Sequence, residues 1–580
     1  MTAPRRTAIP DIERFDRPDG AIELHNCTAL PDPLPDILDR FDHWCAADPD
    51  AVLVSDTDGV RAASWAEIDR RSDAAAARLR GMNLDAGDVL AACAGAGIDH
   101  AVLKLACLKQ GVVHVPLAPA LLVSDFGRAR LAALLKVARP KLILAAGSDV
   151  DRLAPLARVP IHHIEEHCAA SASAVFNRPP HAATDPAALY FTSGSTGDPK
   201  AVVITRAMIA SNQAAYALHW PFLARRRPVL LDWLPWHHVF GGLDNFFKMV
   251  WNGGAYHADL PPSADRVAAM ADRLRDVRPT VHINVPFGIA LLLDRLDADA
   301  PTRDAFFSRL ELIFFAGAGM DAPTWARLRA AVDARATPPL LVSGYGMTEA
   351  ASTICLGLTP AERTAEIGLP LPGHTLKLVP VEPGLATERE SWEIRVRGPN
   401  VAPHYRVKAD TAPLPLDADG FLMTGDLAAA IHAGAPEHGL AFDGRLAEDF
   451  KLTTGTRVKT GALRHALIEA GAPDLADVAI AGEGRDRLAA ILFVRGDPAD
   501  PALAARLEAA LAAHNERQPG SATRIRRAIV AATPPDRAAG EINDKGHLVQ
   551  RRTLANRQAL VARLYSDAPN NGDAILVQQD

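Results

Sequence analysis

Residues Tyr190–Lys200 form a loop sequence that is suited to binding phosphate. The loop reads Tyr-Phe-Thr-Ser-Gly-Ser-Thr-Gly-Asp-Pro-Lys and places four hydroxyl residues and two glycines between Thr192 and Gly197. Glycine tolerates positive φ, so such a loop can bend tightly, and its N–H and O–H groups can converge on phosphate oxygens. Apolar runs at 187–191 and 201–204 predict strands that hold both ends. The alternatives are a flexible linker or a polar hairpin, and the spacing of a Walker loop is absent.

A second segment, Ser343–Glu349, follows an apolar strand and reads Ser-Gly-Tyr-Gly-Met-Thr-Glu. Glycines flank Tyr345, so its ring is placed to lie against a flat ligand such as adenine. Thr348 offers a hydroxyl, and Glu349 offers a hard oxygen of the kind that suits Mg²⁺. A plain turn from strand to helix, with Thr348 as the helix cap, is the alternative interpretation.

Three shorter segments carry weaker signals of the same kind. Phe315–Met320 is poor in side chains, so its backbone permits a ligand to approach closely, although tight packing explains it equally. Asp426, in Thr-Gly-Asp, can place a carboxylate on ribose hydroxyls. Arg445, which follows Gly444, can bring a planar guanidinium to ribose or phosphate. Both residues are also common at turns and surfaces.

Lys545 is notable because lysine is rare in this chain. The sequence has 11 lysines and 51 arginines, and Lys545 is the only lysine after Lys459. An ammonium group on a flexible stem can reach a carboxylate and a phosphate together and offset the charge that develops as they join. A solvated surface lysine is the ordinary alternative.

The segment Leu234–Gly242 is dense in aromatic residues and reads Leu-Pro-Trp-His-His-Val-Phe-Gly-Gly. Trp236 and Phe240 would suit the binding of an aromatic acid, and packed core aromatics with a hydrogen-bonded histidine are the alternative. Metal binding by His237 and His238 is disfavoured, because adjacent side chains diverge and no third ligand is evident.

The order and spacing of these segments resemble the adenylate-forming superfamily of acyl-CoA and aryl-CoA synthetases, luciferases and peptide-synthetase adenylation domains, from about Ala51 to Tyr565. The resemblance implies that Lys545, Thr348 and Glu349 are catalytic and that Glu349 binds Mg²⁺. It implies an ATP- and AMP-binding set of Thr192, Ser193, Gly194, Ser195, Thr196, Gly197, Lys200, Gly317, Ala318, Tyr345, Gly346, Asp426 and Arg445. It also implies an acyl pocket of Trp236, His237, His238, Phe240, Gly241 and Ala316, and a hinge and CoA path of Asp443, Glu448, Lys451 and Gly455. One departure is Gly319, where the family usually has proline.

Within this superfamily, three segments resemble feruloyl-CoA synthases most. They are 232–236, 444–456 and 540–546, the last followed by Arg551 and Arg552. That group tends to have Asn and Thr where this chain has His237 and Val239, so the departures lie near the pocket. They put the identity of the acid in question more than the reaction.

The resemblance implies a ligase that uses ATP, Mg²⁺ and coenzyme A. A carboxylate attacks the α-phosphorus of ATP, and CoA then takes the acyl group from acyl-AMP. The expected acid is a hydroxycinnamate such as ferulate. The alternatives are a fatty acid or another aryl acid, transfer to a carrier protein or an amine, and a non-catalytic acyl or nucleotide sensor.

The bulk composition narrows the class of protein further. A chain of 580 residues is too long for one core, and its net charge of −7 gives no basic field for nucleic acid. No apolar run approaches a membrane span, and no secretory signal follows Arg5 and Arg6. The six scattered cysteines predict buried, reduced thiols, and the expected compartment is the cytoplasm. The oligomeric state is left open.

The predicted fold is α/β. A large N-terminal domain, residues 1–443, is expected to have stacked, mostly parallel sheets with helices and a β subdomain. A small, mobile α+β C-terminal domain, residues 444–580, carries Lys545. Residues 1–50 are expected to wrap the surface as far as a helix at 37–47, and 401–405 is expected to be a short β segment. One helix is predicted at 553–565, followed by a frayed tail at 566–580.

Overall fold

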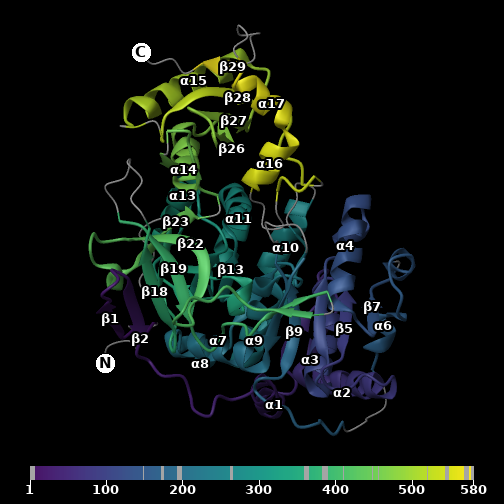
Figure 1. Ribbon diagram of the computed structural model, residues 1–580. Coiled ribbons are helices and arrows are strands. Elements are labelled where there is room, and N and C mark those ends of the chain that lie inside the picture. Colours follow the sequence, from purple (N-terminus) through teal and green to yellow (C-terminus); the bar gives the residue numbers. More distant parts are fainter. Residues whose placement is uncertain are drawn as a thin grey trace.

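A computed structural model gives the structure of the chain. It describes all residues except 1–6, 9, 148, 171–175, 193–198, 262–265, 358–364, 382–389, 409, 447, 455, 519, 521, 538, 543–547, 567–573 and 577–580, and the side chains of 267, 457 and 574–576 are also outside it. The chain forms a large lower body and a small upper body that holds the C-terminal elements (Figure 1).

An eight-stranded sheet forms one wall of the large body. Its strand order is β21-β20-β10-β9-β6-β5-β7-β8. The strands from β9 to β8 are parallel, and β10, β20 and β21 extend the sheet as antiparallel strands. Their bounds are β5 (Val89–Cys93), β6 (Val113–Leu117), β7 (Leu142–Ala145), β8 (Ile161–His163), β9 (Pro186–Phe191), β10 (Ala201–Thr205), β20 (Tyr405–Val407) and β21 (Asp410–Ala412).

A fifteen-stranded sheet forms the other wall, in the order β1-β2-β18-β19-β22-β23-β17-β16-β15-β14-β13-β11-β12-β3-β4. Its parallel centre is β15 (Leu340–Tyr345), β14 (Leu312–Ala316), β13 (Val281–Asn284), β11 (Val229–Asp232), β12 (Ala255–Ala258) and β3 (Val52–Ser55). Antiparallel strands flank it: β4 (Ala62–Ser64), β16 (Cys355–Leu356), β17 (Glu366–Pro370), β23 (Leu440–Arg445), β22 (Leu422–Ala430), β19 (Trp392–Arg397), β18 (Thr375–Pro380), β2 (Ile22–Asn26) and β1 (Ile12–Asp16). The predicted parallel sheet and β subdomain are therefore one continuous sheet.

Helices fill the space between the sheets and cover their outer faces. Nearly every residue of α3 (Ile98–Gln110) is buried, because the helix packs against β3 of one sheet and β6 of the other. Its buried polar side chains have partners, since Lys109 donates to Asp69 and Asp73, both at 2.6 Å. The other helices of the large body are α1 (Ile37–Ala47), α2 (Trp65–Gly81), α4 (Asp125–Ala138), α5 (Asp149–Leu153), α6 (Ile164–His167), α7 (Arg206–His219), α8 (Phe222–Arg226), α9 (Phe246–Asn252), α10 (Val267–Val277), α11 (Pro286–Ala298), α12 (Ala300–Phe307) and α13 (Ala322–Asp333).

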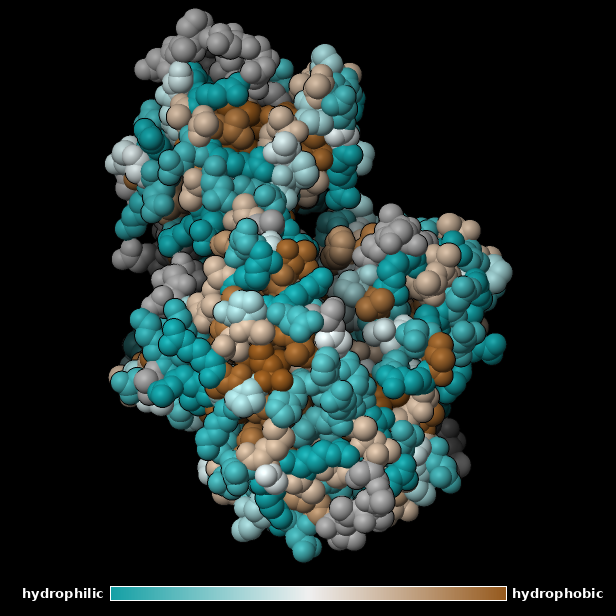
Figure 2. Space-filling model, turned by 90° about the vertical axis from the view of Figure 1, so that its right-hand side faces the viewer, coloured by the Kyte–Doolittle hydropathy of each residue, from teal (hydrophilic) through white to brown (hydrophobic). Residues whose placement is uncertain are grey.

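The small domain has its own sheet and its own core. The sheet is β26 (Leu475–Ala481), β27 (Leu488–Val494), β28 (Ile525–Val530) and β29 (Ala574–Leu576). Helices α14 (Thr460–Ala470) and α15 (Pro501–Glu516) cover one face, and α16 (Gln550–Asn556) and α17 (Gln558–Leu564) cover the other. A hairpin of β24 (Phe450–Lys451) and β25 (Arg457–Val458) leads into the domain, which stands above the large body with a notch on one side (Figure 2).

Several local predictions are wrong. Residues 1–50 contain the β1–β2 hairpin, and β2 pairs with β18, so this segment completes a sheet instead of wrapping the surface. In the tail, 574–576 forms β29, which pairs with β28. The helix predicted at 553–565 is two helices that meet at Arg557, and the strand predicted at 401–405 begins only at Tyr405.

The prediction of buried thiols is confirmed only in part. All six cysteines are free, but Cys27 is exposed and Cys45 is half-buried.

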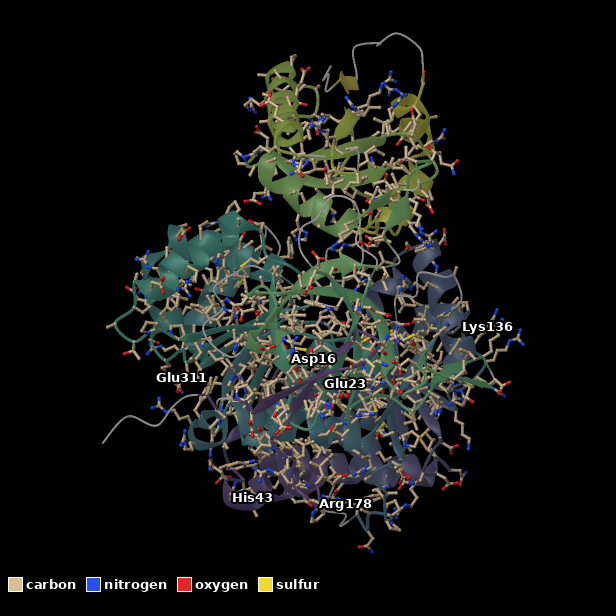
Figure 3. All side chains as sticks on the ribbon, turned by 60° about the vertical axis from the view of Figure 1, so that its left-hand side comes forward. Asp16, Glu23, His43, Lys136, Arg178 and Glu311 are labelled. Carbon is tan, nitrogen blue, oxygen red and sulfur yellow. The ribbon has the colours of Figure 1, made fainter. Side chains whose placement is uncertain are left out.

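Asp16 and Glu23 lie on the hairpin at the front of the large body, whereas Lys136 projects from α4 at its side (Figure 3). Among the described residues, the helices are either too short or too polar to cross a membrane.

We predict that the N-terminal hairpin contributes to the main core. Leu24 in β2 is fully buried, so Leu24→Ala should lower the free energy of unfolding by about 2–5 kcal/mol. Phe15 in β1 is 47 % exposed, so Phe15→Ala should lower it much less. Urea unfolding followed by tryptophan fluorescence measures both changes, and equal small losses in the two variants would show that the hairpin is not part of the core.

Candidate active site

The two ends of the phosphate-loop sequence are held by adjacent antiparallel strands. β9 leads into the loop and β10 leaves it, and the Thr192 N–H donates to the Lys200 carbonyl (3.2 Å). Ser193, Gly194, Ser195, Thr196 and Gly197 lie outside the described residues. The strands on both sides match the sequence prediction, and the loop therefore begins and ends at fixed points of the eight-stranded sheet.

Glu349 lies beside the end of this loop. It belongs to a short 3₁₀ helix, Thr348–Ala350, which follows β15 of the other sheet. Its side chain accepts a hydrogen bond from the Tyr405 hydroxyl (2.9 Å), and the Lys200 ammonium lies 5.4 Å from the centre of the Tyr405 ring. Burial raises the pKa of Glu349, and the bond from Tyr405 opposes that rise. Tyr405 thus links two predicted site residues, although the sequence did not indicate it.

A second linked group surrounds Asp426. The Tyr345 hydroxyl donates to Asp426 Oδ2 (2.8 Å), and Arg445 Nε donates to Asp426 Oδ1 (2.9 Å). Asp426 and Arg445 face each other on paired strands β22 and β23. The nearby Asp426 carboxylate raises the pKa of Arg445, whose side chain is 60 % exposed. The ring of Tyr345 is buried, and its stacking on adenine stays a prediction.

Glycines let the backbone of this site pack closely. Gly317 follows β14 with φ +85°, in the left-handed region that glycine adopts most readily. A Cβ at Gly346 would lie 1.6 Å from the Ser352 carbonyl oxygen, so this position has no room for a side chain. Ala316 ends β14, and Ala318 follows Gly317 in the turn. The parallel strands β14 and β15 end side by side, so these two turns are neighbours.

In the predicted acyl segment, Trp236 is a core residue. It is 2 % exposed, and its indole N–H donates to the Tyr256 hydroxyl (2.7 Å), which in turn donates to Asp232 Oδ2 (3.1 Å). Its ring packs against those of His100, Phe246 and Tyr256. Trp236 therefore supports this segment from behind, and direct contact with an acyl group stays a prediction.

The rest of the acyl segment enters a π-helix, Val239–Asn245. Such helices are rare and occur often at functional sites. The Phe240 ring meets Phe314 of β14 edge-on, with ring centres 5.7 Å apart. A Cβ at Gly241 would lie 2.6 Å from the Leu234 carbonyl oxygen, so the glycine permits the chain to fold back on itself. The half-buried His237 and His238 rings lie 4.5 Å apart.

Of the predicted hinge residues, Asp443 and Glu448 are described next to the predicted boundary. Asp443 and Arg445 are both in β23, so that strand crosses the predicted boundary, and Lys459 donates to Asp443 (3.2 Å). The carbonyl of Glu448 accepts from Thr460 at the start of α14 (2.8 Å).

Lys451 is exposed in β24, and Gly455 lies outside the described residues, as does Lys545. Backbone meets backbone at Gly444 and Gly461, where a Cβ on Gly461 would lie 3.0 Å from the Gly444 Cα. A second contact joins the domains at Gly319, because a Cβ there would lie 2.9 Å from His465 Nε2 of α14. Glycine at this position thus leaves space for the histidine.

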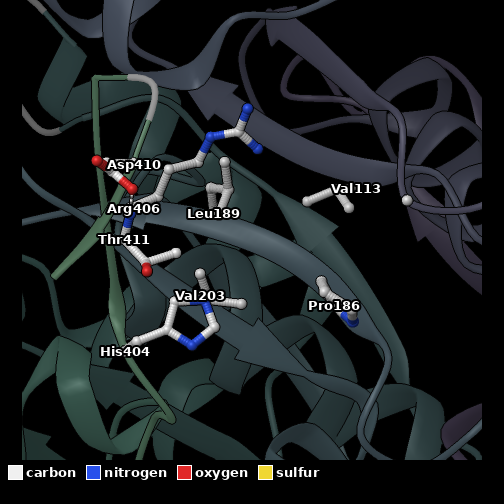
Figure 4. A pocket seen from close by; sticks show the side chains of 9 residues that line it. Val113, Pro186, Leu189, Val203, His404, Arg406, Asp410 and Thr411 are labelled. Carbon is white, nitrogen blue, oxygen red and sulfur yellow. Dashed lines mark hydrogen bonds between the residues drawn. The ribbon is translucent and has the colours of Figure 1, made fainter. Parts of the chain in front are cut away.

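Two surface hollows lie elsewhere. One, of about 240 Å³, is lined by apolar residues of β6, β9 and β10 and by His404, Arg406 and Thr411 (Figure 4). The other, of about 310 Å³, lies beside α6 and is lined by His162, His163 and His167 among others. Of the predicted site residues that the structure describes, none lines either hollow.

The donor set around Glu349 fits Mg²⁺. Within the described part of the chain, no three His, Cys, Asp or Glu side chains are grouped as ligands for a metal ion. Mg²⁺ is commonly held by one or two carboxylates together with substrate phosphates, and Glu349 lies between the ends of the phosphate loop and Asp426. A dedicated multi-ligand metal site is not needed for such binding.

Comparison with known proteins identifies the family of the chain. Residues 41–406 match the family described as AMP-binding enzyme, and residues 449–569 match the AMP-binding enzyme C-terminal domain. The chain therefore belongs to the AMP-binding enzyme family. Its fold is that of the ATP-bound MatB structure from Rhodopseudomonas palustris, with a TM-score of 0.71, 22% identity, and coverage of 90% of this chain and 99% of that one.

The acyl-adenylate complex of o-succinylbenzoate CoA synthetase (MenE) from Bacillus subtilis has the same fold, with a TM-score of 0.71, 21% identity, and coverage of 88% and 97%. The mitochondrial malonate–CoA ligase ACSF3 of Mus musculus is 27% identical over 51% of this chain and 53% of its own length. Long-chain-fatty-acid–CoA ligase 6 of Homo sapiens is 27% identical over 46% and 42%. The chain spans about half the length of these curated relatives.

We predict that Asp232, beneath the acyl segment, makes stability depend on pH. Burial raises its pKa from 3.8 to about 6, so the folded protein binds this proton more tightly than the unfolded chain. The resulting stability is present below about pH 4 and is lost as pH rises through about 6, by up to about 3 kcal/mol. Relative to wild type, Asp232→Asn should therefore gain stability between pH 4.5 and 7.5 in urea unfolding. A difference that does not change with pH would contradict this assignment.

Proposed function

We propose that this chain is an AMP-forming carboxylate–CoA ligase. The observation that carries the proposal is that Lys200, Tyr405 and Glu349 form one linked group and Tyr345, Asp426 and Arg445 form another, beside the ends of a phosphate-loop sequence. An ATP molecule offers one contact to each part: phosphates to the loop, ribose hydroxyls to Asp426, and adenine to Tyr345. The CoA ligases among the relatives support the same activity.

In the first step, an oxygen of the acid carboxylate attacks the α-phosphorus of ATP. The new O–P bond gives acyl-AMP, the bond to the β-phosphate oxygen breaks, and pyrophosphate leaves. Lys200 and the loop would bind the β- and γ-phosphates, and Lys545 would offset charge on the joining groups. Mg²⁺ would neutralise phosphate charge when bound at Glu349. No protein nucleophile is required, so catalysis is positioning and charge stabilisation.

In the second step, the CoA thiolate attacks the acyl carbon and AMP leaves. The residues for this step differ, because the small domain is proposed to rotate and bring the Gly455 region to the acyl group. The pairing of Gly444 with Gly461 supports this, since no side chain lies between the two backbones at that point, and the Lys459–Asp443 bond and the Gly319–His465 contact would part as the domain turns. The division at 443/444 is proposed to act as this swivel.

The proposed acid is a hydroxycinnamate such as ferulate. The half-buried Phe240, held edge-on against the buried Phe314, offers an aromatic surface that suits a flat ring, and the resemblance of three segments to feruloyl-CoA synthases agrees. A fatty acid is the second candidate, because several curated relatives are long-chain-fatty-acid–CoA ligases.

A pyrophosphate-release assay tests both levels of the proposal. Ferulate, p-coumarate, benzoate, malonate and saturated fatty acids of several lengths are supplied with ATP and Mg²⁺, with and without CoA. Release with ferulate and formation of its CoA thioester would support the proposal in full. A preference for long chains would make a fatty acid the substrate. Pyrophosphate release without formation of a CoA thioester would mean that another acceptor takes the acyl group, and no release with any acid would favour a non-catalytic sensor.

We predict that Lys545→Ala lowers the rate of adenylation by more than a hundredfold, about 3 kcal/mol or more of barrier. The same variant should convert supplied acyl-AMP and CoA to thioester at close to the wild-type rate, because its role is limited to the first step. Single-turnover measurements of the two half-reactions separate these effects. Equal loss in both half-reactions would remove the assigned role.

We predict that Tyr405→Phe makes adenylation more sensitive to acid. Tyr405 donates to the Glu349 carboxylate and so favours its charged form, which opposes the effect of burial on the pKa. Loss of a bond to a charged group, worth about 1.5 kcal/mol, should raise the Glu349 pKa and move the acid limb of the pH–rate profile up by about one pH unit. An unchanged acid limb with a uniformly lower rate would mean that Tyr405 acts only through packing.

A further inference from the structure

We propose that Asn400 is a positioning residue for Glu349, acting through the turn that follows it and assisted by Asn212. This inference rests on the proposed function of Glu349 as the Mg²⁺ ligand. Asn400 touches neither ATP nor the acid in this proposal. Its amide instead fixes the backbone that carries the ligand.

The turn after Glu349 has an unfavourable backbone and needs external support. Ala351 has φ +50° and Ser352 has φ +117°, both in the left-handed region that residues other than glycine avoid. Such conformations persist only where surrounding structure enforces them. The Ser352 N–H donates to the Met347 carbonyl (3.2 Å), and the Ile354 N–H donates to the Tyr345 carbonyl (2.8 Å), so the turn closes on the adenine segment.

Asn400 supplies much of that support. It is fully buried, and its Nδ2 group donates to the carbonyls of Ala350 and Thr353, both at 2.8 Å, and lies 3.0 Å from Asn212 Oδ1. Asn212 Nδ2, on α7, donates to the carbonyl between them, that of Ala351 (2.8 Å). Three carbonyls of the turn, those of Ala350, Ala351 and Thr353, thus accept from two buried amides that are distant in sequence.

The orientation of the Asn400 amide is itself fixed. The carbonyls of Ala350 and Thr353 can only accept, so they fix the NH₂ group toward the turn, and Oδ1 then lies 2.6 Å from His374 Nε2. A carboxylate at position 400 would keep the shape but lose both N–H donors. The carbonyls of Ala350 and Thr353 would then face oxygen in a buried space, which disfavours the observed turn.

The segment 400–405 makes three contacts that hold Glu349: one to the turn, one to its backbone and one to its side chain. Asn400 binds the turn, the Ala402 N–H donates to the Glu349 carbonyl (2.8 Å), and Tyr405 donates to the Glu349 side chain (2.9 Å). From the opposite side, the Tyr216 hydroxyl lies 2.5 Å from Thr353 Oγ1 and donates to the buried Asp244 (2.9 Å). The turn is therefore clamped between the 400–405 segment and α7.

The test compares Asn400→Asp with a matched control, Asn26→Asp. Asn26 is also buried, donates to one carbonyl, that of Pro370 (2.8 Å), and accepts from the Thr28 N–H (3.0 Å), but it does not contact the turn. Two properties of the full-length protein are measured: amide hydrogen exchange of a peptide spanning 345–355, and the Mg²⁺ concentration that gives half-maximal ATP binding by calorimetry.

In Asn400→Asp we expect exchange in 345–355 to increase about tenfold and the half-saturating Mg²⁺ concentration to rise about tenfold. Neither should change in Asn26→Asp, even if both variants lose similar stability in urea. ATP binding without Mg²⁺ should remain within about twofold of wild type, because Asp426 and Lys200 are untouched. If Asn400→Asp does not fold, the same two measurements are made on Asn212→Leu. This variant loses the bond to the Ala351 carbonyl, so amide exchange in 345–355 should again rise.

Unchanged exchange in 345–355, or equal changes in the Asn26 control, would overturn the positioning role. The exchange measurement uses no ligand, so it decides that role even if wild type binds no ATP. Absence of Mg²⁺-dependent ATP binding in wild type would count against the proposed function of Glu349, and hence against the part of the inference that concerns Mg²⁺.

Discussion

The hydrogen bond from Tyr405 to Glu349 is the contact on which the arrangement of the site depends. Glu349 is only 8 % exposed, and a carboxylate in such a place favours the neutral form unless a donor stabilises its charge. Tyr405 provides that donor from β20, a strand of the eight-stranded sheet, whereas Glu349 follows a strand of the fifteen-stranded sheet. One bond therefore joins the two walls of the large body at the point where phosphate and metal would meet.

Because the two sheets meet there, strands of both sheets hold the site residues in place. β14 and β15 end side by side and deliver their glycine turns together, while β9 and β10 fix the ends of the loop opposite. The helix α3 between the sheets is almost wholly buried, so a relative shift of the walls would disturb a large apolar core. Positioning of this kind suits a reaction in which the protein forms no covalent bond with its substrates.

Much of the fold was predictable because its strongest signals are local. The strands predicted at 187–191 and 201–204 are β9 and β10, and the helix predicted at 37–47 is α1, because apolar runs and turn residues mark their ends. The N-terminal hairpin was missed because a short alternating strand such as Ile22–Asn26 is stable only through its pairing with β18, a partner more than 340 residues away. The C-terminal β29 was missed for the same reason.

The residues of the candidate site likewise divide into those that local sequence reveals and those that depend on long-range contacts. Glycines, Glu349, Asp426 and Arg445 carry chemistry that residue type and order reveal, and the structure brings the last two together directly. Tyr405, Phe314 and Asn400 gave no signal, since their parts depend on contacts between remote segments. Trp236 shows the converse, because an aromatic residue in a motif can serve the core behind the pocket.

The contact between Gly444 and Gly461 bears on the relative populations of different orientations of the small domain. Two backbones in contact without side chains offer little dispersion energy and no interlocking shape. Side chains around the pair do favour the observed orientation, because Lys459 donates to Asp443 and His465 lies against Gly319. In the proposed rotation these contacts would part, and a bound nucleotide, acid or thiol that prefers one orientation by a few kcal/mol would decide which orientation is populated.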